Sequence, residues 1–265
     1  MRSLASTVFA VVALAGCATT PIASGPVTPK APPPPPFALT NITADQKSLV
    51  AIMLHITGQL GPGVTGNKVA LTAKYGETEL ATDSASFTAD SAGSFTVDLP
   101  VKLGASAADL AKYQGFETMQ ILVDGKLEGT PHSGTHAVVV RSPHLPTTKV
   151  LSVQASRTEV NTLEVTYWIR ISNPNTFEVK VTSMPYTAKV ADKVLSKSAL
   201  PAELKVPPSA ENEFQIPTAA TPANCGKDFN TMVKKTELPW SFVGTVEIGG
   251  VEMAYDLTGQ LKLSK

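Results

Sequence analysis

Residues 168–181, WIRISNPNTFEVKV, contain two alternating segments separated by asparagine, proline and asparagine. Apolar residues occupy every second position in residues 163–171 before the break and in residues 177–181 after it. A period of two predicts β-strands with one buried face. Proline cannot donate to a strand ladder, and asparagine bonds local backbone and tolerates unusual dihedrals. Residues 173–175 are therefore predicted to form a fixed turn or bulge at which two strands bend or cross.

The strand pattern around this break occurs twice in the chain. Residues 50–81 align without a gap on residues 165–196, and after a four-residue insertion residues 95–127 align on residues 214–246. Aligned pairs include Ile56 and Ile171, Ala73 and Ala188, Phe95 and Phe214, Leu110 and Phe229, and Val123 and Phe242. A repeat this long predicts two domains of similar fold.

Each copy consists of short alternating segments separated by proline- and glycine-bearing turns, which indicates a β-sandwich. We therefore predict an all-β protein with tandem sandwiches at residues 37–144 and 149–265. One segment in each copy has apolar residues three and four apart instead of two, at residues 106–113 and 226–235. These two segments are predicted to be short helices packed on the sandwiches.

Residues 1–16 resemble a signal peptide, with Arg2 before an apolar run of 11 residues, which is too short to span a bilayer. The run ends in LAGC, which resembles the bacterial lipobox and predicts that Cys17 is acylated after cleavage. The alternative is an ordinary signal peptide with an incidental cysteine. With Cys17 acylated, Cys225 is the remaining thiol of the mature chain and is expected to be a small packed residue.

Residues 17–36 are rich in proline, threonine and alanine and end in five consecutive prolines. Such a segment has too few large apolar residues to fold, and the prolines favour a stiff polyproline II rod. We interpret it as a spacer that holds the body off the membrane. A docking site for a proline-binding partner is the alternative.

The second copy resembles the late embryogenesis abundant type-2 family, also called the WHy domain. The resemblance rests on Asn173, Pro174, Asn175 and Phe177 within the strand pattern, and on the strand pair that follows, YTAKVADKVLSKSAL. It covers roughly residues 149–265. The first copy has Gly58-Gln59-Leu60 at the aligned position, so it is a diverged copy.

The resemblance implies an immunoglobulin- or fibronectin-like sandwich without catalytic residues, associated with stress such as desiccation. It also implies a protein that binds or protects other macromolecules. With the lipobox, it suggests a lipid-anchored envelope protein; Ala18 after the cysteine suggests the outer membrane, facing the periplasm. An accessory or assembly lipoprotein of an envelope complex is the alternative.

Neither the composition nor the motifs of the sequence favour nucleic-acid binding, catalysis or metal binding. Lys+Arg and Asp+Glu are equal at 22 each, which gives no electrostatic reason to expect nucleic acid as a partner. No phosphate-binding loop or nucleophile motif is present, so we expect no enzyme activity and no cofactor. His132 and His136 are four apart and could share a metal on a strand, but no local ligand completes a set, so no metal is expected.

Trp168 and Arg170 alternate with the apolar residues of their strand, so both are expected to point away from the core. An outward tryptophan beside an arginine suits a partner surface for an unidentified protein or envelope component. The alternative is that Trp168 packs within the second sheet or is covered by the first domain.

Overall fold

The computed structural model describes residues 35–159, 161–200 and 203–263. The signal segment, Cys17 and the tether up to residue 34 lie outside these described residues. Residues 35–265 form one compact unit. Pro36, at the end of the predicted tether, is already part of this unit. Its carbonyl accepts a hydrogen bond of 2.9 Å from Gly61 N.

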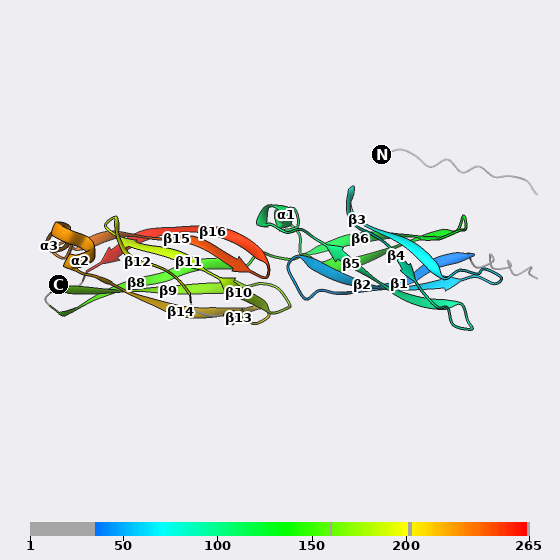
Figure 1. Cartoon of the computed structure of the whole chain (residues 1–265), viewed down its shortest axis with the longest axis horizontal. Helices are drawn as coiled ribbons and strands as arrows, with labels where there is room; N and C mark the ends of the chain where they lie inside the picture. Colours follow the sequence, from blue (N-terminus) through cyan, green and yellow to red (C-terminus); the bar gives the residue numbers. More distant parts are fainter. Residues whose placement is uncertain (1–34, 160, 201–202, 264–265) are drawn as a thin grey trace, which may run out of the picture. The chain divides into compact units, whose positions relative to one another are not determined.

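Two antiparallel sheets form the first half of this unit. Their strands are β1 (Phe37–Asp45), β2 (Ala51–Leu60), β3 (Lys68–Tyr75), β4 (Thr78–Ser86), β5 (Ser94–Lys102), β6 (Thr118–Leu127) and β7 (Ser133–Arg141). One sheet has the order β1-β2-β5 and the other β4-β3-β6-β7. The two sheets lie face to face (Figure 1).

The second half repeats this plan. Its strands are β8 (Thr147–Glu159), β9 (Thr162–Asn173), β10 (Val179–Ser183), β11 (Pro185–Val190), β12 (Lys193–Ala199), β13 (Leu204–Val206), β14 (Ala210–Ala220), β15 (Glu237–Ile248) and β16 (Val251–Lys262). One sheet has the order β14-β9-β8. In the other, β15 pairs with β16 on one side and with β11 and then β10 on the other, while β12 and β13 lie at the edges.

The alternation of buried and exposed side chains along the strands explains why each half forms two sheets packed face to face. Along β9 every second residue is buried, and Tyr167, Ile169 and Ile171 are fully inside. Along β2 the same holds for Ile52, Leu54 and Ile56. Burying such faces between two sheets is the main favourable contribution to folding. The all-β prediction is confirmed.

The sheet registers partly confirm the internal alignment. Ala73 on β3 lies opposite Val123 on β6, and their aligned equivalents Ala188 and Phe242 lie opposite each other on β11 and β15. The pairing of β3 with β6 is therefore repeated, residue for residue, by the pairing of β11 with β15.

The other sheet corrects the alignment. Ile56 lies opposite Val97, whereas its equivalent Ile171 lies opposite Asn212. The match of Phe95 with Phe214 was therefore wrong by four residues. A shift of four keeps every side chain on the same face of a strand, so the alternating pattern could not reveal the error.

The helices show where the four extra residues lie. In the first half, Ser106 and Asp109 form a capping box that begins α1 (Ala107–Ala111). In the second half, Thr221 and Asn224 form the same box 115 positions later, at the start of α2 (Pro222–Cys225). The extra residues therefore follow the cap, and Cys225, not Phe229, takes the place of Leu110.

The second half contains more than the one helix predicted. After α2, Gly226 has a φ of 62°, which ends the turn, and the chain continues as η1 (Gly226–Asp228) and α3 (Phe229–Met232). The predicted range 226–235 began too late because Thr-Pro-Ala-Asn was not recognised as a cap with proline at the first helical position. Within the described part of the chain, no helix is long and apolar enough to cross a membrane.

Candidate functional site

The Asn-Pro-Asn segment carries the chain from one sheet to the other. Asn173 ends β9, and the chain resumes in the facing sheet at β10. Phe177, Val179 and Val181 point into the core after the break, as the alternation predicted. Asn173 and Asn175 are themselves buried, with 2% and 4% of their surface exposed. The sequence predicted a fixed turn here but not the burial of both amides.

The Asn173 side chain holds three backbone segments together. Its Nδ2 donates to the carbonyls of Phe177 (2.7 Å), Val206 (3.2 Å) and Pro207 (3.0 Å). Its Oδ1 accepts from the backbone N and from Nδ2 of Asn175, both at 3.0 Å. One amide therefore satisfies a carbonyl just before β10 and two more at the end of β13, in the last strand residue and the residue after it.

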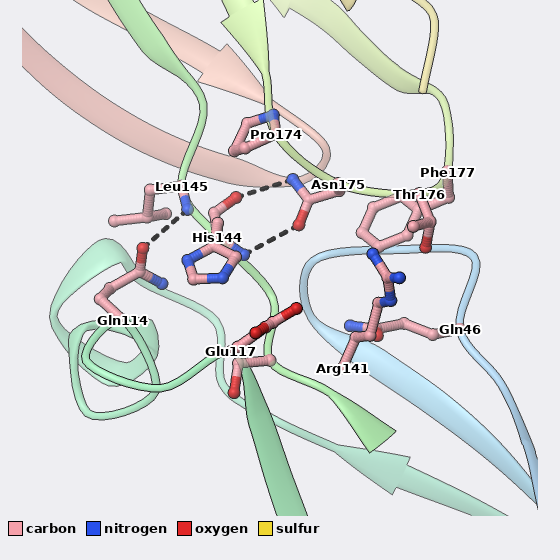
Figure 2. Close-up of a pocket in the computed structure, with 11 residues that line it drawn as sticks. Gln46, Gln114, Glu117, Arg141, His144, Leu145, Pro174, Asn175, Thr176 and Phe177 are labelled. Carbon is pink, nitrogen blue, oxygen red and sulfur yellow. Dashed lines mark hydrogen bonds between the residues drawn. The ribbon is translucent and has the colours of Figure 1, made fainter. Parts of the chain in front are cut away.

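The Asn175 side chain binds the segment that joins the two halves. Its Nδ2 donates to the His144 carbonyl at 2.7 Å, and its Oδ1 accepts from the His144 backbone N–H at 2.8 Å (Figure 2). This paired contact resembles one rung of a β-ladder, with a side-chain amide in place of a strand. On the other side of the same segment, Gln114 Nε2 donates to the Pro143 carbonyl at 2.7 Å, and Leu145 N donates to Gln114 Oε1 at 2.9 Å.

A pocket of about 440 Å³ lies beside these contacts. Pro174, Asn175 and Phe177 form part of its wall, together with the His144 segment (Figure 2). Two further lining residues, Gln46 and Ser142, each have a buried polar atom, Nε2 and Oγ respectively, without a hydrogen-bond partner among the described residues. Leaving such an atom unpaired costs about 1–3 kcal/mol.

Opposite charges also face the pocket. Arg141, the last residue of β7, and Glu117, just before β6, both line it and are both exposed. Neither forms an ion pair within the described ranges. Sequence reasoning did not single out Gln46, Gln114, Glu117, Arg141 or Ser142. They come from three segments far apart in sequence, at residue 46, residues 114–117 and residues 141–142, and no local motif links these segments.

The first half has a different arrangement at the aligned position. There β2 continues through Leu60, and the Gln59 amide donates to the carbonyls of Leu60 and Ala92. Ala92 lies before β5, as Pro207 lies before β14. A glutamine amide thus makes the kind of contact that Asn173 makes in the second half. Gly58 leaves room for the Phe95 ring, which would lie 2.1 Å from a Cβ at that position.

Trp168 and Arg170 lie on the face of β9 opposite to the buried tyrosine and isoleucines. Trp168 is half-buried between Ser152 on β8 and Gln215 on β14. The Arg170 guanidinium pairs with Glu211 at 3.0 Å and with Glu213, which raises the pKa of Arg170. Its charge is therefore already matched within the sheet.

His144 lines the pocket, whereas His55, His132 and His136 do not. His136 lies on strand β7, and His132 lies just before it. Within residues 35–159, 161–200 and 203–263, no three His, Cys, Asp or Glu side chains are grouped to hold a metal. His55 pairs across strands with Asp98, its Nδ1 lying 2.7 Å from the carboxylate. Cys225 is buried, and burial raises the pKa of its thiol.

The comparisons with known proteins bear on the half that contains this site. A family model described as late embryogenesis abundant protein matches residues 169–263, from the middle of β9 to the end of the described chain. The resemblance of the second half to the late embryogenesis abundant type-2 family is therefore confirmed. This late embryogenesis abundant domain includes the Asn-Pro-Asn corner and Phe177. A search of curated proteins gave no match.

Two solved structures have a partial likeness to the chain. A protein from Archaeoglobus fulgidus has 11% identity and a TM-score of 0.35, with 45% of this chain and 98% of that chain covered. Red sea bream transglutaminase has 10% identity and a TM-score of 0.28, with 86% of this chain and 32% of that chain covered. Likenesses this weak do not bear on function.

Proposed function

We propose that this protein is a non-catalytic, lipid-anchored protein of the bacterial cell envelope. In this proposal it binds or protects proteins or other envelope components during desiccation or other stress. The match of residues 169–263 to the late embryogenesis abundant family is the observation that carries the proposal. The LAGC sequence before the proline-rich segment supports the anchor at Cys17, and Ala18 after the cysteine supports the outer membrane as its site.

The surface of the first half suits weak contact with many partners. Strand β4 forms an edge and carries mostly exposed threonine, serine and carboxylate side chains. On β6 and β7, Leu122 and Val139 are exposed on neighbouring positions among polar residues. Hydroxyl and carboxylate groups can replace lost water at a partner's surface, and a small apolar patch can cover exposed apolar groups.

The anchor is tested by changing Cys17 to alanine. We expect the wild-type protein to sediment with the outer membrane and its N-terminal peptide to carry acyl chains in mass spectrometry. The variant should leave the membrane fraction almost completely. The acyl chains supply the apolar area that holds the wild-type protein in the membrane, and a cleaved signal segment supplies none. A variant that still fractionates with the membrane, or a wild-type peptide without acyl chains, would contradict the lipid anchor.

Protection is tested by drying a labile enzyme with and without the purified protein and measuring its activity after rehydration. We expect more activity to survive than with an equal mass of serum albumin. The double variant Leu122→Ser/Val139→Thr should protect less and still fold, because both side chains are exposed. Equal survival with albumin would contradict the protective function. Crosslinking that captures one stoichiometric partner regardless of drying would indicate an accessory subunit of an envelope complex instead.

A further inference from the structure

The pocket beside the Asn-Pro-Asn corner presents hydrogen-bond donors on one side. Gln46 Nε2 and Ser142 Oγ are buried without a partner among the described residues, and Ser142 is only 3% exposed. The Arg141 side chain extends beside Gln46 (Figure 2). A guanidinium, an amide N–H and a hydroxyl together match a carboxylate, which accepts several hydrogen bonds at once.

The pocket is also lined by a negative charge. Glu117 lies between Gln114 and Arg141 in Figure 2, and its backbone carbonyl accepts a hydrogen bond of 3.0 Å from Ser142 N. It has no cationic partner within 4.0 Å in the described part of the chain. A ligand that carries only a carboxylate would leave Glu117 unmatched and repelled. A ligand with a carboxylate and an ammonium group would match both charges.

Apolar groups complete the wall. Pro174 and Phe177 from the corner and Leu145 from the joining segment line the same pocket. The volume of about 440 Å³ lies within the range of small-molecule sites, roughly 300–1,000 Å³. Asn175 and Gln114, which bind the backbone of residues 143–145, fix the position of this wall.

We propose that this pocket binds a free α-amino acid with an apolar side chain. Its carboxylate faces Arg141, Gln46 and Ser142, its ammonium group faces Glu117, and its side chain lies against Pro174, Phe177 and Leu145. This site does not depend on the protective function proposed above, because it is enclosed by different residues from the exposed patch on β6 and β7.

The test is titration of the full-length protein, solubilised in detergent, with L-leucine, N-acetyl-L-leucine and L-leucinamide by calorimetry. Leucine is expected to bind, with the two blocked analogues at least about tenfold weaker, since each lacks one charge-assisted contact. Leucine should also shift the amide resonances of Ser142 and Gln46 in NMR spectra. If leucine causes no heat and no shift at millimolar concentration, or if either blocked analogue binds equally well, the proposal is wrong.

Variants assign the two ends of the ligand. Arg141→Gln and Glu117→Gln are each expected to weaken leucine binding at least about tenfold, and both should fold because both side chains are exposed. The matched controls Lys126→Gln and Glu252→Gln remove equal charges from exposed strand positions outside the pocket and should leave binding unchanged. If the pocket variants and the control variants weaken leucine binding equally, the effect comes from the overall charge of the protein and not from the pocket, and the proposal is wrong.

Discussion

Changing Asn173 to alanine is expected to lower the free energy of unfolding of the second half by about 3–5 kcal/mol, because several buried groups lose their partners at about 1–3 kcal/mol each. The change removes the donor to the carbonyls of Phe177, Val206 and Pro207 and the acceptor for Asn175. Asn173 is 2% exposed, so water cannot readily replace these bonds.

Urea unfolding followed by tryptophan fluorescence measures this effect. Both tryptophans of the chain, Trp168 and Trp240, lie in the second half, so the signal reports that half alone. The neighbouring change Ser172→Ala is the control, because Ser172 is only half-buried and its hydroxyl bonds the exposed side chain of Glu211. It should shift the free energy of unfolding by no more than about 0.5 kcal/mol. If the two variants had similar midpoints, the corner would not hold the sheets together.

The strands were predictable because their evidence is local. Every second residue is apolar in residues 163–171 and 177–181, and this alternation identified the buried face of each strand correctly. The proline at position 174 likewise required a break in the ladder, whatever surrounded it.

The bonds made by the corner depend on residues far away in sequence. Asn175 meets His144, which is 31 positions distant, and Asn173 meets Pro207, which is 34 positions distant. Nothing beside either asparagine indicates those partners. The pocket residues Gln46 and Ser142 come from still more separated loops, so only the folded chain brings them together. The four-residue error in the internal alignment has a related cause. An alternating strand pattern looks the same after a shift of two or four residues, so it cannot reveal such an error.

Raising the pH above about 10 is expected to destabilise the second half by nearly 3 kcal/mol per pH unit, because two buried tyrosines each contribute about 1.4 kcal/mol per unit. The Tyr167 hydroxyl donates to the Lys189 carbonyl at 2.9 Å, and the Tyr255 hydroxyl donates to the Pro185 carbonyl at 2.9 Å. Burial raises the pKa of both phenols far above its ordinary value. Their stabilisation is complete below the unfolded pKa near 10 and is lost as the pH rises toward the folded pKa.

Urea midpoints between pH 8 and pH 11.5 test this prediction, with the double variant Tyr167→Phe/Tyr255→Phe as the comparison. The variant should be less stable at pH 8, because two hydrogen bonds are lost, but its stability should fall much less steeply above pH 10. Lys180 and Lys193 also have a raised pKa, caused by Glu203 and Asp228, so their ion pairs weaken in the same pH range. These pairs are exposed, and high salt screens them, so a slope that persists in high salt belongs to the buried phenols. An equally steep fall in the phenylalanine variant would mean that the tyrosines do not govern alkaline unfolding.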